Sequence, residues 1–314
     1  MESLYQILGI PFGWLLYALF RMGIHNYAAL IVIITLVTRI IMIPSSIAQQ
    51  KGMAKTQRIQ SKIRKIQQKY AGDQKKIQEE TQNLYQREGY NPMGSGCAPM
   101  VVQFILLFGL IGVIYYPLSN FLHISEAEVA ALKEAVKALG ASVKFDRLLE
   151  LEVFKHIDTL AENGVKGVSP ETLALIKQVG FKIGPISLGD VPKENGVGII
   201  WIIPVLSFLS TIGSSIYSMI KQKQSGTGGG QMGKSMGCMT VFMAAISLMF
   251  VVQYPVGIGV YWIASSVFAL ISSVIIGQIY TPKKMLAKLM VDETIERRSR
   301  ENNIKFAVNN KEEK

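Results

Sequence analysis

The chain has 314 residues, of which 49% are hydrophobic and only 18% carry a charged side chain, against roughly 25% charged in a typical soluble domain. It has 33 basic and 22 acidic residues, a net charge of +11. This composition argues against a soluble enzyme. With two cysteines, Cys97 and Cys238, and only three histidines, the chain supports neither a disulfide scaffold nor a zinc site.

The apolar residues occur in long blocks that charged segments separate. Blocks of about 18 or more apolar residues are long enough to cross a bilayer as helices. The sequence therefore predicts an all-α polytopic membrane protein with five transmembrane helices, an N-terminal interfacial helix and a helical hairpin. The expected spans are residues 27–46, 98–118, 198–220, 236–253 and 258–279.

Residues 1–26 precede the first span, and Pro11–Met22 is too short to span a bilayer. Its aromatic residues and its terminal Arg21 favour a helix that lies in the headgroup interface, with a short first span as the alternative. Residues 47–97 are polar and basic, and helical patterning over 47–70 and 73–87 is broken by Ala71-Gly72. These residues are expected to form a helical hairpin in water.

Residues 119–197 form a polar segment with three short helical patterns. The first is expected to begin at Ser125 with a capping box to Glu128, the second at Asp146, and the third at Ser169-Pro170. Glycines 140, 164 and 180 are suited to end them. A glycine-rich loop, 221–235, precedes the fourth span. The charged tail, 280–314, has little apolar surface and is expected to be disordered.

Charge asymmetry between the expected loops predicts the orientation in the membrane. The hairpin has ten basic and four acidic residues, the glycine-rich loop three and none, and the tail nine and six. Residues 118–198 have nine basic and eleven acidic residues. Because cytoplasmic loops carry the excess of Lys and Arg, the hairpin, the glycine-rich loop and the tail are expected in the cytoplasm, with the N-terminus outside.

Arg39 is the first candidate functional residue, because a charged side chain within a span usually faces a partner or a water-filled cavity. The alternative is that Arg39 snorkels, since Pro44 at the cytoplasmic end lies only five residues away. Thr35 lies four residues before Arg39 and therefore on the same helical face. This pairing favours a polar surface inside the bundle.

The third span carries a stripe of hydroxyl residues on one helical face, with the spacing i, i+3, i+4, i+7, i+8 and i+11: Ser207, Ser210, Thr211, Ser214, Ser215 and Ser218. One interpretation is close helix packing through small residues. The other is that the stripe lines a hydrated groove with Arg39, Gln103 and the pairs Ser265-Ser266 and Ser272-Ser273. Tyr261 and Trp262 are more typical of interface anchors.

The stretch 228–235 (GGGQMGKS) matches the phosphate-binding pattern G-x-x-x-x-G-K-S. That motif functions between a strand and a helix of an α/β domain, whereas here it joins two expected spans, so we interpret the match as accidental. The sequence shows no paired carboxylates, nucleophile elbow or metal cluster. It therefore predicts neither an enzyme nor a cofactor.

Four stretches of the chain resemble the YidC/Oxa/Alb family of membrane protein insertases. They are Thr38–Pro44 (TRIIMIP), 91–100 (NPMGSGCAPM), 204–207 (PVLS) and 255–262 (PVGIGVYW). Together with five spans and a basic hairpin after the first, these stretches are specific for the family. The segment between the second and third spans is longer than the family pattern, and the serine stripe replaces the polar residue expected on the third span.

The resemblance implies a compact Gram-positive-type insertase of the bacterial plasma membrane, with a groove open to the cytoplasm and to lipid but closed outside. It implies nascent membrane proteins, the ribosome, the Sec translocon and the lipid bilayer as partners. The expected groove residues are Arg39, Thr35, Gln103, Ser207, Ser210, Ser214 and Trp262. The alternative function is a small-anion transporter or channel that binds its substrate at Arg39, although no internal repeat supports it.

Overall fold

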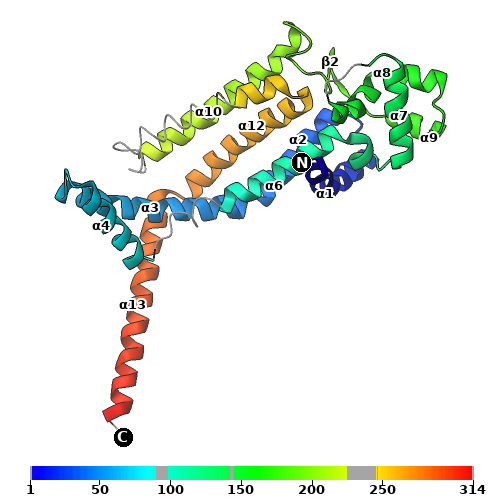
Figure 1. Cartoon of the computed structure of the whole chain (residues 1–314). Helices are drawn as coiled ribbons and strands as arrows, with labels where there is room; N and C mark the ends of the chain where they lie inside the picture. The colour runs from blue at the N-terminus through cyan, green and yellow to red at the C-terminus, as the bar shows by residue number, and fades with distance from the viewer. Residues whose placement is uncertain (1, 90–97, 142–144, 225–244, 246, 313–314) are drawn as a thin grey trace. The chain divides into compact units, whose positions relative to one another are not determined.

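The computed structural model describes residues 2–89, 98–141, 145–224, 245 and 247–312, and these are mainly helical (Figure 1). The chain divides into two compact units, which are described separately below. The first consists of Met1–Met42, Met100–Tyr217 and Gly237–Ile271, and the second of Ile43–Pro99, Ser218–Met236 and Ser272–Lys314. The motif at 91–97 and the phosphate-loop match at 228–235 lie outside the described residues.

Apolar helices form the framework of the first unit. They are α2 (Tyr27–Ile41), α6 (Ala98–Tyr115), α10 (Ile202–Gln224) and α12 (Val256–Ile279). Two described stretches, Ile199–Lys221 and Val256–Ile279, are long and apolar enough to cross a bilayer, whereas Tyr27–Ile41 and Val102–Tyr115 are shorter apolar helices. Of the expected fourth span, residues 247–253 are helical and most of the rest lies outside the described residues.

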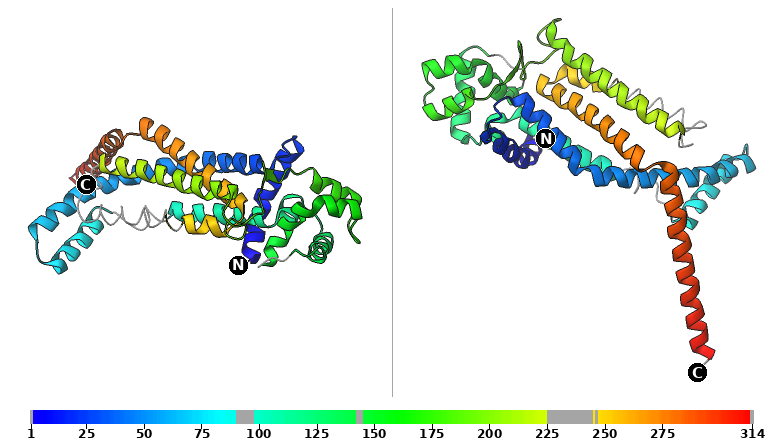
Figure 2. Two further views of the ribbon diagram at one scale, coloured as in Figure 1. Left: turned by 90° about the horizontal axis from the view of Figure 1, so that it is seen from above. Right: turned by 180° about the vertical axis from the view of Figure 1, so that it is seen from behind.

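Helices α10 and α12 run side by side (Figures 1 and 2), and small residues allow this close approach. The hydroxyls of Thr211 and Ser266 lie 3.3 Å apart across the interface. A Cβ atom added at Gly259 of α12 would overlap Ile203 of α10. Part of the hydroxyl stripe therefore packs against a neighbouring helix.

Helix α1 (Glu2–Arg21) is longer than the sequence predicts, because it begins at Glu2 and contains Pro11 within it. Its inner face packs closely against the end of the second apolar helix. A Cβ atom added at Gly13 would overlap the carbonyl oxygen of Asn120, and one added at Gly112 would overlap that of Tyr5. Its other face leaves Ile7 and Trp14 exposed, 65% and 59% respectively. An apolar outer face is typical of a helix in contact with lipid.

The polar segment 119–197 folds into three short helices, α7 (Glu126–Ala138), α8 (Leu149–Asn163, preceded by the 3-10 turn η2, Asp146–Leu148) and α9 (Pro170–Lys177). The predicted starts are confirmed, since Ser125 and Ser169 cap α7 and α9 with their side chains. The all-α prediction omits a small antiparallel hairpin, β1 (Lys182–Ile183) with β2 (Ile186–Ser187). A hairpin this short has no sequence periodicity to reveal it.

Segment 119–197, called the outer segment after the side of the membrane that the charge asymmetry predicts for it, supplies hydrogen-bond acceptors to the first turns of two apolar helices. The amide of Tyr27 at the start of α2 donates to the carbonyl of Gly180 (3.0 Å). At the start of α12, Val256 donates to Asp190 and Gly257 to Leu188, both at 2.9 Å. Helix N-termini leave amide groups without intrahelical partners, so these bonds tie the segment directly to the apolar helices.

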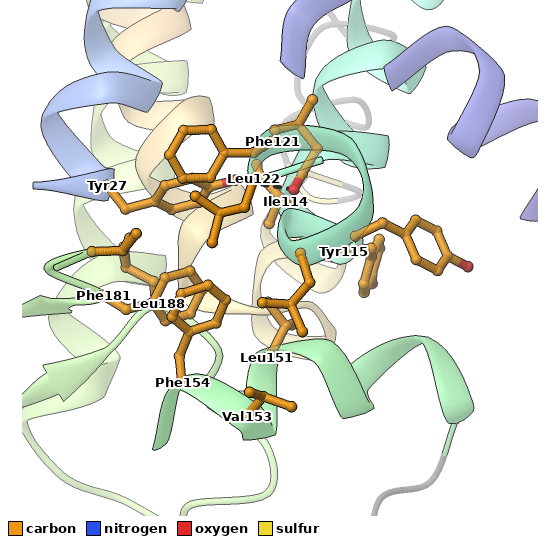
Figure 3. Close-up of a cluster of buried hydrophobic side chains, with 14 of the residues drawn as sticks. Tyr27, Ile114, Tyr115, Phe121, Leu122, Leu151, Val153, Phe154, Phe181 and Leu188 are labelled. Carbon is orange, nitrogen blue, oxygen red and sulfur yellow. Dashed lines mark hydrogen bonds between the residues drawn. The ribbon is translucent and has the colours of Figure 1, made fainter. Parts of the chain in front are cut away.

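A shared core joins the outer segment to the apolar helices (Figure 3). Aromatic rings from three parts of the chain meet there: Tyr27 lies 5.2 Å from Phe121 and 5.1 Å from Phe181, and Phe181 stacks on Phe154 at 4.3 Å. The fully buried hydroxyl of Tyr27 donates to the carbonyl of Val113 (3.0 Å). The segment is therefore an integral part of the first unit.

The second unit contains α3 (Ile43–Lys69), α4 (Gln74–Arg87) and α13 (Pro282–Glu312). Helices α3 and α4 confirm the two helical patterns of the predicted hairpin. They join through a turn in which Asp73 caps α4 by accepting a hydrogen bond from the Lys76 amide (3.1 Å). An ion pair between Lys62 and Glu88 closes the hairpin.

The expectation of a disordered tail is wrong, because residues 282–312 form one helix, α13, whose first part packs against α3 (Figure 1). Strong helix formers dominate its sequence, and proline at the first position is compatible with a helix start. Ion pairs of the i,i+4 type, Arg297–Glu301 (3.5 Å) and Arg300–Glu296 (3.9 Å), add local support. Composition alone did not reveal these contributions.

Candidate polar intramembrane site

Arg39 lies in the last turn of α2, and its guanidinium points toward α12. There it donates a hydrogen bond to the hydroxyl of Ser265, which is itself 7% exposed. This contact favours the interpretation that Arg39 faces a partner within the helical unit over the alternative that it snorkels to the interface.

A small cavity surrounds the arginine. Its lining residues come from three helices. Thr38, Arg39 and Met42 lie at the C-terminal end of α2, Gln103, Leu106 and Leu110 belong to α6, and Tyr261 belongs to α12. The side-chain amide of Gln103 donates to the hydroxyl of Tyr261 (3.4 Å). Arg39, Gln103, Tyr261 and Thr38 therefore contribute polar side chains to a cavity whose other lining residues, Met42, Leu106 and Leu110, are apolar.

The arginine has no acidic partner among the described residues, where its hydrogen-bond acceptor is neutral Ser265. A charged group away from water is strongly attracted to an opposite charge, because the effective dielectric constant is low there. The arrangement can therefore bind a carboxylate or another anionic group that enters the cavity.

Thr35 does not line this cavity. Its side chain is fully buried, and its hydroxyl donates to the carbonyl of Ile31 one turn earlier on α2 (2.6 Å). The shared helical face was predicted from the i,i+4 spacing, but the hydrogen bond within the helix satisfies the hydroxyl. Thr35 is thus part of the packing beneath the site.

The predicted serines of the third span also lie outside the cavity lining. The hydroxyl of Ser210 donates to the carbonyl of Ser207 (2.9 Å), and that of Ser214 to the carbonyl of Thr211 (2.9 Å). Ser207 is fully buried, and its hydroxyl has no hydrogen-bond partner among the described residues. The stripe follows α10, and part of it packs against α12, as the small-residue interpretation predicts.

The aromatic residue of the site is Tyr261, not Trp262. Trp262 is half-buried, packs against the hydrophobic core and meets Tyr261 edge-on (centroids 6.1 Å apart). The sequence suggested interface anchors for both, and only Trp262 was included among the expected groove residues, so Tyr261 was missed. The available signal was the i,i+4 spacing of Tyr261 and Ser265, which places them on one helical face.

Apolar helices long enough to span, joined to a polar cavity that contains an arginine, define a helical membrane protein. The family described as the 60Kd inner membrane protein matches residues 19–284. Because this match covers most of the chain, the protein belongs to that family.

Several relatives are called membrane protein insertase YidC. The protein of Clostridium perfringens (strain 13 / Type A) is 28% identical over 263 residues, which cover 84% of this chain and 82% of the relative. Those of Fusobacterium nucleatum and Oceanobacillus iheyensis are both 37% identical, over 91 and 97 residues. These shorter matches cover 29% and 30% of this chain and 44% and 38% of the relatives.

Proposed function

We propose that this chain is a membrane protein insertase, which helps nascent membrane proteins to enter the bilayer and fold there. The observation that carries the proposal is the family match over residues 19–284, within which Arg39 lies in a polar cavity among apolar helices. The reaction involves no covalent step. The protein lowers the barrier for moving a polar flank across the bilayer, and the apolar part of the client then partitions into lipid.

In this proposal Arg39 attracts an acidic flank of the client. A charged residue at the centre of a membrane helix costs about 2.5–3.5 kcal/mol on insertion scales, and an opposite charge in the cavity offsets part of that cost. The membrane potential contributes a further driving force for moving a charged flank across the bilayer, about 2.3 kcal/mol per charge for each 100 mV. Gln103 and Tyr261 provide hydrogen-bonding groups beside the arginine.

We further propose five spans, with the N-terminus outside and the C-terminus in the cytoplasm of a bacterial cell. The charge asymmetry between the loops supports this orientation. Two exposed lysines test it: Lys65 of α3 and Lys166 in the outer segment. In a chain without its native cysteines, a cysteine at position 166 should react with an impermeant maleimide in intact cells, and one at position 65 only after permeabilisation. The opposite pattern would exclude this orientation.

The ribosome and the Sec translocon are proposed as partners of the cytoplasmic and membrane parts. Beyond its first turns, α13 exposes several basic residues, including Arg297 and Arg300. A basic helix is suited to a salt-dependent contact with ribosomal RNA. Truncation of α13 should therefore weaken co-sedimentation with ribosomes, most clearly at low salt.

The experiment that tests the proposed function is photo-crosslinking to a stalled nascent membrane protein. A photoreactive residue at Gln103 places the probe in the cavity, and one at Val267, which is 39% exposed on α12, serves as the control. Crosslinks to the client from position 103 that exceed those from 267 are expected. If position 103 gives no client crosslinks while vesicles containing the protein show a substrate-dependent anion flux, the chain is a transporter and the proposal fails.

A further inference from the structure

A second concave feature lies in the second unit, and among its lining residues only Ser272 belongs to the groove candidates named from the sequence. It has a volume of about 320 Å³, and its walls are two helical ridges. The beginning of α3 supplies Ile43 and Ile47, and the end of α12 supplies the others: Ser272, Ile275, Ile276, Ile279 and Tyr280. Since residues spaced by three or four lie on one helical face, each helix contributes a continuous ridge, and together they form a groove lined mainly by isoleucine.

This groove lies along the last turns of a helix that is long enough to span a bilayer. Two of the isoleucines are well exposed for apolar residues, Ile275 at 51% and Ile279 at 58%, whereas Ile276 is only 5% exposed. The apolar sequence ends at Tyr280, and tyrosine is typical of the boundary between hydrocarbon and headgroups. One end of the groove therefore faces the region where lipid headgroups lie.

That end of the groove is positively charged, because the N-terminus of α13 and two lysines lie there. Helix α13 begins immediately after Tyr280, and the hydroxyl of Thr281 accepts a hydrogen bond from the Lys284 amide (3.4 Å). A helix N-terminus carries a partial positive charge, and the first turn of α13 contains no acidic residue to neutralise it. Lys284 and Lys288 are both exposed and lie one turn apart. Anionic groups are favoured at such a position.

We propose that this groove binds one anionic phospholipid, with an acyl chain between the two isoleucine ridges and the phosphate at the start of α13 beside Lys284. Along the groove, apolar residues are followed by Tyr280 and then by lysines. In an anionic phospholipid, the apolar acyl chains are likewise followed by the interfacial glycerol region and then by the anionic phosphate, so each part of the lipid meets a suitable part of the groove. A client helix matches the apolar ridges but has no anionic group that must lie at the membrane boundary. This groove and the Arg39 cavity have no lining residue in common, and the proposal does not depend on the proposed function.

The test uses the full-length chain in vesicles of equal parts phosphatidylglycerol and phosphatidylcholine. A photoreactive residue replaces Ser272 in the groove or Val267 as the control on α12, and mass spectrometry identifies the lipid attached to each. Phosphatidylglycerol should exceed phosphatidylcholine about fivefold at position 272, the effect of one lysine near an anionic headgroup. At position 267 the two lipids should appear in their bulk ratio.

Two variants separate the parts of the site. Lys284→Glu should return the lipid ratio at position 272 to the bulk value while total lipid crosslinking persists. Ile275→Trp fills the groove and should lower total lipid crosslinking at 272 but not at 267. A bulk lipid ratio at position 272 in the otherwise unaltered chain, or crosslinks from 272 mainly to polypeptide, would overturn the proposal.

Discussion

Glu150 shows how a single side chain holds the outer segment in place. This carboxylate is fully buried, yet it accepts hydrogen bonds from the amides of Leu118 (2.9 Å) and Ser119 (3.2 Å) and from the Ser119 hydroxyl (2.9 Å). Lys133 of α7 lies 3.1 Å away and neutralises the charge. A buried charge is tolerated only when it is paired and hydrogen-bonded, and Glu150 meets both conditions.

Removing this carboxylate should destabilise the protein strongly. Glu150→Ala leaves Lys133 without its partner and the two amides without an acceptor, which should lower the free energy of unfolding by about 3–5 kcal/mol. The measurement is denaturant unfolding in detergent micelles. Glu162→Ala, at an exposed position of the same helix, is the control and should change stability by less than about 0.5 kcal/mol. Equal effects of the two substitutions would show that the buried network contributes nothing.

The sequence predicted the site in part, and the reason differs from residue to residue. Arg39 and Gln103 could be found because a charged or amide side chain within an apolar helix is unusual. Tyr261 was missed although its i,i+4 spacing to Ser265 was a signal, because a tyrosine near a helix end is equally typical of an interface anchor. Which serines of the stripe point toward α12 depends on how α10 and α12 pack, and helical periodicity alone does not determine this.

At the scale of elements, local chemistry predicted helix starts well. Ser125 and Ser169 cap α7 and α9 because a hydroxyl can accept a hydrogen bond from an amide only a few residues away. The full length of α1 was not predicted, because it depends on packing against distant residues. The helical state of the tail follows both from local features, its strong helix formers and i,i+4 ion pairs, and from packing against α3, and its composition alone did not indicate it. Helix α1 packs against the end of α6, and α13 packs against α3.

The packing of α1 predicts that one glycine cannot be replaced. Gly13→Ala places a methyl group on the carbonyl oxygen of Asn120, and overpacking of this kind typically costs about 1–3 kcal/mol. Gly213→Ala on α10 is the matched control, since nothing lies within 4 Å of the added atom. Thermal unfolding in detergent should show a lower midpoint for the first variant alone. A midpoint for Gly13→Ala at or above that of Gly213→Ala would contradict the close contact.

The junction between α7 and α9 should depend on pH. The backbone amide of Ser169 donates to Glu128 (3.1 Å), and this bond is the largest cause of the lowered pKa of the Glu128 carboxyl. Burial opposes it, and side-chain hydrogen bonds from Thr172, Ser125 and Ser169 lower the pKa further. A lowered pKa in the folded state means that the stabilisation is complete above the ordinary pKa of 4.5 and disappears as the pH falls through the lowered value.

Comparison with Glu128→Gln isolates this effect. The wild-type protein should have the higher melting temperature at neutral pH. The difference should shrink as the pH falls below 4.5 and vanish once the carboxyl is protonated in the folded state. A difference that is constant across this range would show that the ionised carboxylate has no special role.

At the scale of the whole molecule, the outer segment and the apolar helices of the first unit share one hydrophobic core (Figure 3). The sequence predicted a polar segment with three helices but not this shared core, because the aromatic residues that form it, such as Phe154 and Phe181, are distant in sequence from Tyr27 and Phe121. Contacts between residues so distant in sequence depend on how the chain folds back on itself, and local sequence patterns do not predict them. The segment thus links helices of the first unit that are distant in sequence, α2 and α12 among them.

In the function proposed for this chain, membrane proteins insert through the polar site at Arg39, and reconstitution into lipid vesicles is the decisive test. Purified protein in vesicles should convert a short client with an acidic flank to a protease-protected form. Arg39→Ala should lower the initial rate about tenfold, equivalent to about 1.4 kcal/mol in the barrier, while Arg39→Lys should retain much of the activity because it keeps the charge. A client without acidic residues in its flank should be far less affected. Two results would contradict this proposal. One is insertion of the acidic client by the Arg39→Ala variant at the wild-type rate, and the other is insertion by the wild-type protein no faster than in empty vesicles.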